Sequence, residues 1–143
     1  MIGLLQRVTS ASVSVNGEPI AAIGRGLLVL AAVHRDDVEA DYRRLAERIC
    51  QYRVFADDAG RMNRSLADTG FELLLVPQFT LAADTKKGNR ASFTRAAAPE
   101  KGAAFFEQLA AACRERLSTV QCGQFGADMQ VALVNDGPVT FWL

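Results

Sequence analysis

The sequence is poor in the side chains from which metal and redox sites are usually built. Its 143 residues include only three cysteines, an odd number with no Cys-x-x-Cys pair, and a single histidine, His34. Structural zinc needs about four cysteine or histidine ligands at short spacings. The sequence therefore predicts no metal site and a protein whose thiols stay reduced.

Net charge and long apolar runs are also missing. The 16 basic and 16 acidic residues cancel, so no overall field attracts nucleic acid or a membrane surface, and a polyanion contact would need a local patch. No run approaches the ~20 apolar residues of a membrane span. The first residues lack the charged start of a signal peptide. We expect a cytoplasmic protein that makes no membrane contact.

Familiar catalytic motifs are absent as well. The sequence has no P-loop, no His-Glu-x-x-His and no Gly-x-Ser-x-Gly pattern. Adjacent acids occur as Asp36-Asp37 and Asp57-Asp58, which we interpret as a helix cap and a turn. His34 has no Ser or Cys beside it in the sequence, and Cys113 lies on the predicted inner stripe of a helix. An enzyme of this sequence would work with backbone groups, hydroxyls and its substrate's own chemistry.

The sequence does contain a pattern of about seven or eight strands and two long helices. Asn16-Gly17 between alternating apolar residues predicts a hairpin. An apolar run over residues 27–33 predicts a central strand, and residues 129–143 predict two strands joined by a turn. We therefore predict a single domain over residues 1–143 with a sheet-rich, mixed α/β fold. Two curled β-sheets would form a barrel-like core with the two helices packed outside.

The most informative stretch is a predicted buried strand that ends in polar residues. The apolar run Leu73–Val76 is followed by Pro77 and then by Gln78-Phe79-Thr80. Because Pro77 cannot donate to a neighbouring strand, the N–H groups after it are free to face something else. The alternative is an ordinary strand that ends at a proline. A second polar stretch, Asn135–Thr140, lies near the C-terminus.

Positive charge is concentrated in one predicted loop, residues 82–99. Four basic residues fall within ten positions of this loop, and only Asp84 offsets them. They are Lys86, Lys87, Arg90 and Arg95. In a chain of zero net charge they form a local patch suited to phosphate groups. A loop that is merely solvated is the alternative.

The two polar stretches resemble the two signature motifs of the D-aminoacyl-tRNA deacylases. The family usually has Ser-Gln-Phe-Thr-Leu and Asn-x-Gly-Pro-Val-Thr, and this chain has Pro77-Gln78-Phe79-Thr80-Leu81 and Asn135-Asp136-Gly137-Pro138-Val139-Thr140. The resemblance covers the whole chain. Other stretches that match in order and spacing are Leu5–Val8, Ile23–Leu30, Ala83–Gly88, Ser92–Thr94 and Phe125–Met129. One departure is Pro77, where the family usually has Ser.

The resemblance implies a homodimeric, cofactor-free esterase that removes D-amino acids, and glycine mischarged on tRNA-Ala, from tRNA. Its catalytic residues would be Gln78, Phe79 and Thr80. The N–H groups of Phe79 and Thr80 would bind the oxyanion, at about 3 kcal/mol for each donor. The tRNA 2′-hydroxyl would help to activate the attack. Thr80 would then be a positioning residue, although a threonine nucleophile is chemically possible.

The resemblance also implies how the protein would proofread chirality. Gly137 and Pro138 would form a cis peptide that enters the partner subunit's pocket. There their carbonyl oxygens would hold the substrate's α-ammonium group and leave no room for an L side chain. Arg7 would fix this loop, and Met129 belongs to the same substrate-binding set. The residues expected to bind tRNA are Lys86, Lys87 and Arg90.

A second interpretation comes from a different class of function. The same fold could serve as a non-catalytic module that binds an RNA end or a small metabolite, with the basic loop on its phosphates. Deacylation of D-Tyr-tRNA, compared with L-Tyr-tRNA, separates the two.

Overall fold

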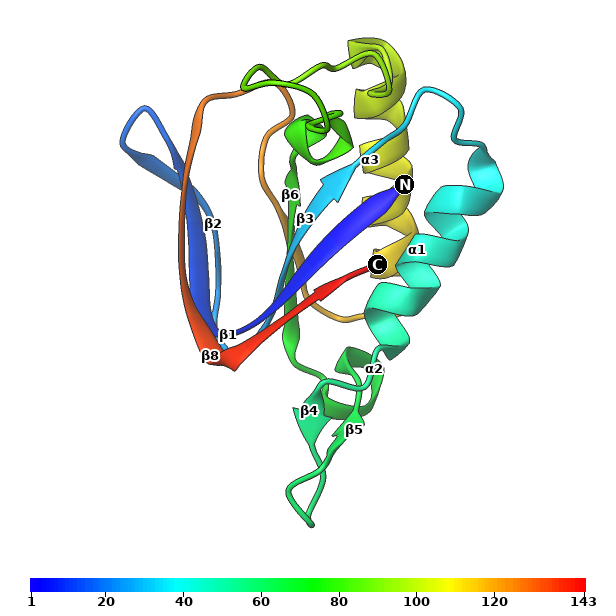
Figure 1. The fold of residues 1–143 in the computed structure, drawn as a ribbon. Helices are drawn as coiled ribbons and strands as arrows, with labels where there is room; N and C mark the ends of the chain where they lie inside the picture. The colour runs from blue at the N-terminus through cyan, green and yellow to red at the C-terminus, as the bar shows by residue number, and fades with distance from the viewer.

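Long strands and two long helices make up most of the chain in a computed structural model that describes residues 1–143 (Figure 1). The strands are β1 (Ile2–Val15), β2 (Glu18–Ile23), β3 (Gly26–Ala32), β4 (Phe55–Ala56), β5 (Met62–Arg64), β6 (Glu72–Pro77), β7 (Val120–Cys122) and β8 (Met129–Trp142). The helices are α1 (Glu39–Gln51), α2 (Leu66–Thr69), the 3₁₀ helix η1 (Phe79–Ala82) and α3 (Pro99–Arg114). No helix is long and apolar enough to cross a membrane.

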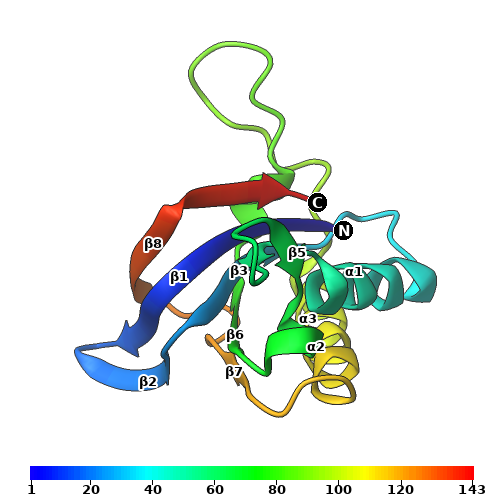
Figure 2. The same cartoon turned by 90° about the horizontal axis from the view of Figure 1, so that it is seen from below.

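One six-stranded sheet curls around the core. Its order is β2-β1-β3-β6-β7, and β8 pairs with β1. The first half of β1 pairs with β3 and the second half with β2, while β8 follows both halves. Both long strands bend between the halves (Figures 1 and 2). The predicted sheet-rich α/β fold with a barrel-like core and two outer helices is confirmed, and β1 and β8 join the two curled parts into one sheet.

The core has two parts, one on each face of β6. Leu73 and Leu75 face α1 and α3, where they pack in a cluster of 20 buried residues. Leu74 and Val76 face the inside of the curled sheet and a second cluster of 8. Burying such a side chain stabilises the fold by about 2 kcal/mol. Burial on both faces explains why this strand is an unbroken apolar run, and it fixes the position of the polar residues that follow.

The sequence predicted the first hairpin turn correctly but not the residue that caps the first helix. The hairpin at Asn16-Gly17 is present, with both residues at positive φ, 50° and 79°. The predicted cap of α1 by Asp36 and Asp37 is wrong, because Val38 is the N-cap residue. Asp37 instead accepts hydrogen bonds from the His34 N–H and the Met1 ammonium group, both at 2.7 Å. The buried ammonium group of Met1 pairs with this carboxylate, which is then not available to cap α1.

Candidate active site

The chain turns sharply where β6 ends. Pro77 is the last strand residue, and the Gln78 N–H donates to the carbonyl of Ala31 at 2.7 Å. The helix η1 then begins at Phe79, and its first turn closes with a bond from the Leu81 N–H to the Gln78 carbonyl. A helix start leaves its first N–H groups without acceptors inside the helix. Those of Phe79 and Thr80 are therefore available, as the sequence predicted, whereas that of Gln78 is occupied.

The side chains of this turn bond to each other. Gln78 Nε2 donates to Thr80 Oγ1 at 2.5 Å, and this is the one side-chain hydrogen bond that the Thr80 hydroxyl makes. No carboxylate or imidazole forms a hydrogen bond with that hydroxyl, as the activation of a threonine nucleophile would require.

A cavity of about 560 Å³ opens beside this turn. Pro77, Gln78 and Phe79 line one side, and Met129 and Phe125 line another. The remaining lining residues, mostly small or apolar, are Val76, Phe93, Ala96, Ala97, Pro99, Gly126, Ala127 and Val131. A largely apolar cavity of this size with a few polar groups suits a small ligand or the end of a larger one.

The structure brings Gln78, Phe79 and Met129 together although they are far apart in the sequence. It also adds aromatic residues that had no predicted role. Phe79 remains 56% exposed, and its ring lies 5.2 Å from that of Phe93. Phe125 approaches the α3 backbone closely, since a Cβ on Gly102 would lie 3.0 Å from its ring. An exposed aromatic side chain in a polar loop was the signal available for Phe93.

The second motif forms a bulge within a single strand. Residues 136–139 of β8 oppose only Arg7, because Asn135 pairs with Val8 and Thr140 with Gln6. The predicted turn between two strands is thus an excursion of one 14-residue strand. Gly137 has φ 141°, and the Gly137-Pro138 peptide is cis, as the resemblance implied. Both residues are exposed and lie outside the cavity of their own chain.

Two side chains hold the base of this bulge. Arg7 donates from Nε to the Asp136 carbonyl at 2.9 Å and from Nη1 to the Val54 carbonyl at 2.6 Å. Asn135 Oδ1 accepts from the Val139 N–H at 2.7 Å, and its Nδ2 donates to the Val139 carbonyl at 3.2 Å and to Thr140 Oγ1 at 3.0 Å. Asn135 therefore closes the excursion across its base, a role that its place in the motif did not reveal.

The tip of the basic loop lies outside the cavity lining, although Phe93, Ala96 and Ala97 near the end of the same loop belong to it. Asp84 and Ser92 bridge its two sides, and residues 85–91 form its tip. The loop projects away from the sheet and the helices (Figure 2). The exposed side chains of Lys86, Lys87 and Arg90 form no ion pair. The patch is available to a phosphate-bearing partner.

The cysteines do not form a reactive centre. Cys50 and Cys113 are fully buried among the side chains of α1 and α3. A hydrogen bond with the Cys50 thiol, together with burial, raises the pKa of Cys113. Burial also raises the pKa of Cys122. Thiols with raised pKa values are poor nucleophiles, so Cys113 is a core residue, as the helical stripe predicted. No group of three or more His, Cys, Asp or Glu residues is placed to hold a metal ion.

Comparisons with known proteins cover almost the entire chain. Residues 4–143 match the family model of D-Tyr-tRNA(Tyr) deacylase. A D-aminoacyl-tRNA deacylase of Alkalilimnicola ehrlichii is 62% identical over 143 residues, which are 100% of this chain and 95% of that protein. One of Xanthomonas campestris pv. campestris is 59% identical over 144 residues, covering 100% and 99% of the two chains.

Two solved structures have a similar fold. One is named c-Myc DNA Unwinding Element Binding Protein, with a TM-score of 0.95 and 40% identity over 100% of this chain and 97% of that chain. The other is described as a probable eukaryotic D-amino acid tRNA deacylase, with a TM-score of 0.87 over 99% and 97% of the chains. At 20% identity, the second comparison concerns the fold alone.

Proposed function

The chain belongs to the D-Tyr-tRNA(Tyr) deacylase family, and we propose that it hydrolyses the ester bond of D-aminoacyl-tRNA to release a free D-amino acid and tRNA. The observation that carries this proposal is the match over residues 4–143. It includes the Gln78-Phe79-Thr80 turn beside the cavity and the Gly137-Pro138 bulge. The enzyme is thus a hydrolase of the D-aminoacyl-tRNA deacylase type.

Catalysis would rest on the backbone of η1. Ester hydrolysis places negative charge on the carbonyl oxygen, and a fixed N–H donor stabilises it by about 3 kcal/mol. The available N–H groups of Phe79 and Thr80 supply such donors, while Gln78 holds the Thr80 hydroxyl. None of the residues lining the cavity carries a carboxylate, imidazole or thiol. The 2′-hydroxyl of the terminal adenosine then assists the attacking water, and no cofactor takes part.

Chiral selection would require two subunits. In one chain Gly137 and Pro138 are exposed and do not line their own cavity. Strand β8 pairs only with β1, so its other edge is free for a partner, and it exposes the large apolar side chains of Val134 and Trp142. In a homodimer the bulge of one subunit closes the partner's cavity beside Met129. Its carbonyl oxygens hold the α-ammonium group, and an L side chain is excluded.

The substrate range follows from this arrangement. A site that rejects L side chains by exclusion has no means of rejecting glycine, so glycyl-tRNA mischarged on tRNA-Ala is a second substrate. Lys86, Lys87 and Arg90 contact tRNA phosphates. The enzyme acts in the cytoplasm, where it removes wrongly charged tRNA as part of translation quality control.

Deacylation of D-Tyr-tRNA, L-Tyr-tRNA and glycyl-tRNA by the purified protein tests the function. We expect rapid release of D-tyrosine and glycine and no release of L-tyrosine above the uncatalysed rate. Binding of D-Tyr-tRNA without hydrolysis would instead support the non-catalytic binding module, an outcome worth testing because a 40% identical structure bears the name of a DNA-binding protein.

A further inference from the structure

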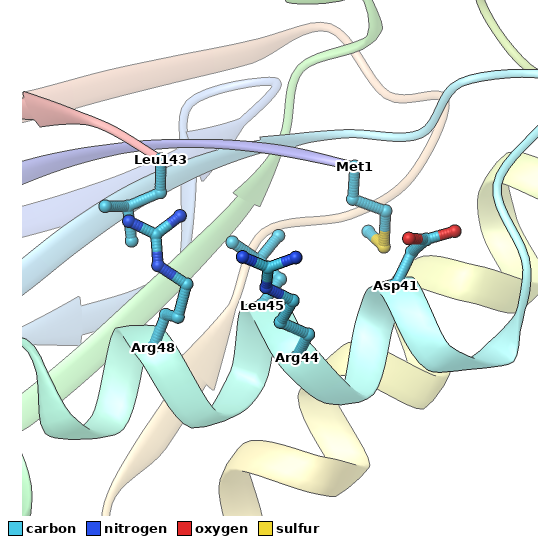
Figure 3. A pocket seen from close by; sticks show the side chains of 6 residues that line it. All are labelled: Met1, Asp41, Arg44, Leu45, Arg48 and Leu143. Atoms are coloured by element: carbon cyan, nitrogen blue, oxygen red, sulfur yellow. The ribbon is translucent and has the colours of Figure 1, made fainter.

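A second cavity, of about 240 Å³, lies between α1 and the two chain ends. It is lined by Met1, Asp41, Arg44, Leu45, Arg48 and Leu143. Figure 3 shows the guanidinium groups of Arg44 and Arg48 on the side of the helix that faces the chain ends. None of the residues assigned to ester hydrolysis or chiral selection lines this cavity.

Both arginines lack an acidic partner. Seven ion pairs occur in the chain, and one of them joins Arg43 to Glu39 on the same helix, but none involves Arg44 or Arg48. The guanidinium carbon of Arg48 lies 5.7 Å from the centre of the Tyr52 ring. Neither the Arg44 nor the Arg48 guanidinium donates a hydrogen bond within the chain. Like charges at positions i and i+4 destabilise a helix by a few tenths of a kcal/mol. A bound anion would remove this repulsion.

Two carboxylates belong to the lining, the side chain of Asp41 and the α-carboxylate of Leu143, and neither forms an ion pair with Arg44 or Arg48. Asp41 Oδ2 accepts the N–H of Val38 at 2.7 Å and so caps the start of α1. In Figure 3 it lies at the opposite end of the cavity from Arg48. The cavity thus presents two unpaired guanidinium groups beside the apolar side chains of Met1, Leu45 and Leu143. The planar fork of arginine matches a phosphate group, which it binds through two parallel hydrogen bonds.

The proposed substrate supplies such phosphates. A cavity of about 560 Å³ holds the aminoacylated end of a tRNA, and the remaining nucleotides must lie over the surface. Met1 lines the smaller cavity, and the next residue, Ile2, packs in one small cluster with Ala82 at the end of η1. We propose that Arg44 and Arg48 form a phosphate subsite for the backbone of the tRNA. This inference rests on the proposed function.

The test compares Arg44→Gln/Arg48→Gln with the wild-type enzyme on two substrates, D-Tyr-tRNA and the short ester D-tyrosyl-adenosine. We expect kcat/KM on the tRNA to fall about tenfold, with a salt dependence shallower by about one to two units for two lost phosphate contacts. Hydrolysis of the short ester stays unchanged. Arg43→Gln is the matched control, since its charge is already paired with Glu39, and it leaves the salt dependence as in the wild type.

Each other result decides against the subsite. An unchanged salt dependence in the double variant would mean that the arginines are merely solvated. An equal loss on both substrates would mean that the change acts through the fold. Titration with inorganic phosphate alone and with uncharged tRNA separates the two sources of phosphate and does not depend on hydrolysis. Binding of inorganic phosphate that is lost in the variant, with tRNA affinity unchanged, would assign the cavity to a free phosphate. If the wild type hydrolyses no D-aminoacyl-tRNA, the proposed function fails, and the affinity for uncharged tRNA still decides the subsite.

Discussion

The two signature motifs of this chain are built in opposite ways. At the end of β6, η1 begins with two backbone N–H groups that have no acceptor in the chain, Phe79 lines the adjacent cavity, and the one side-chain bond of the turn joins Gln78 to Thr80. At the bulge of β8, side chains of Arg7 and Asn135 hold the backbone, and neither Gly137 nor Pro138 lines the cavity beside η1. The first motif offers free backbone donors beside a cavity, and the second is an exposed bulge braced by side chains.

From this difference we expect the first motif to set the rate and the second to set the selectivity. Donors that stabilise a developing charge must be fixed, and the start of a short helix attached to a buried strand provides that. A group that excludes one enantiomer must resist displacement by the excluded side chain, and a braced bulge provides that. Changes in η1 should therefore lower the rate with all substrates, whereas changes in the bulge should alter the ratio of D to L hydrolysis.

The largest effect is expected for Phe79→Pro. Proline is tolerated at the first position of a helix, so the fold is retained, but one of the two proposed oxyanion donors is lost. We expect kcat on D-Tyr-tRNA to fall by about 10²–10³. The control Phe79→Leu keeps the N–H and removes only the ring, so its loss should be far smaller. Single-turnover deacylation measures both.

Thr80→Ala tests the same region from the side chain. If the backbone stabilises the oxyanion, this variant keeps its activity within about tenfold of wild type, because only the bond from Gln78 is lost. An inactive Thr80→Ala protein with an unchanged thermal unfolding profile would contradict the backbone mechanism and support a threonine nucleophile.

The second largest loss of activity is expected for Gly137→Ala in the bulge, after that of Phe79→Pro. A Cβ there would lie 2.7 Å from Val139 Cγ2 and 3.0 Å from the Val139 nitrogen, at a φ of 141° that side chains rarely adopt. Gly137→Ala must therefore displace the bulge, so we expect the ratio of D-Tyr-tRNA to L-Tyr-tRNA hydrolysis to fall, together with a loss of roughly 10²-fold in the rate on D-Tyr-tRNA for a shift of about 1 Å. Gly17→Ala is the control. Its φ of 79° is also positive, but no atom lies within 4 Å, so it should lower stability without changing activity.

Mixing the Phe79→Pro and Gly137→Ala variants tests whether each active site combines the turn of one subunit with the bulge of the other. In a heterodimer of Phe79→Pro and Gly137→Ala, one site combines an intact turn with an intact bulge. Random exchange of subunits should restore about a quarter of wild-type activity. No restoration after exchange, confirmed by mass spectrometry of mixed dimers, would mean that turn and bulge act within one chain.

Asn135→Ala should have a smaller and more selective effect. It removes three hydrogen bonds across the base of the bulge, each worth about 1 kcal/mol. We expect roughly tenfold slower hydrolysis of D-Tyr-tRNA together with measurable hydrolysis of L-Tyr-tRNA. Asn135→Asp keeps the acceptor for the Val139 N–H and should recover part of the selectivity. Thr140→Val, which removes one of the three bonds, should stay close to wild type. A fall in both rates at a constant ratio would indicate a purely structural role.

What could be predicted from the sequence was local. Asn16-Gly17 determined a hairpin because its turn needs only those two residues, and the apolar run before Pro77 predicted a buried strand because both faces of β6 are covered. The cap of α1 was wrong because the Met1 ammonium group, distant in sequence, competes for Asp37.

The site shows the same limit. The motif identified Gln78 and Phe79, but their meeting with Met129 depends on how β8 crosses the curled sheet. The bracing by Arg7 joins positions 129 residues apart, from Arg7 to Asp136. The role of Asn135 was missed for a different reason: the amide bonds span a bulge, whereas the sequence predicted a turn between two strands. Long-range register, which no local pattern contains, decides these contacts.

The smallest effect is expected at the basic loop. Changing its lysines tests whether tRNA is bound by residues outside both η1 and the bulge. Lys86→Glu/Lys87→Glu should lower the salt dependence of tRNA hydrolysis by about one unit for each lost phosphate contact and slow it several-fold at moderate salt. Hydrolysis of D-tyrosyl-adenosine and the D to L ratio should not change, since both lysines lie outside the cavity and the bulge. Arg61→Glu, on the β4–β5 hairpin at the far end of the molecule from η1 (Figure 1), controls for net charge. Arg61→Glu reverses one charge instead of two, so if it changes the salt dependence by half as much as the double lysine variant, only overall charge matters, and the loop has no defined contact with the tRNA.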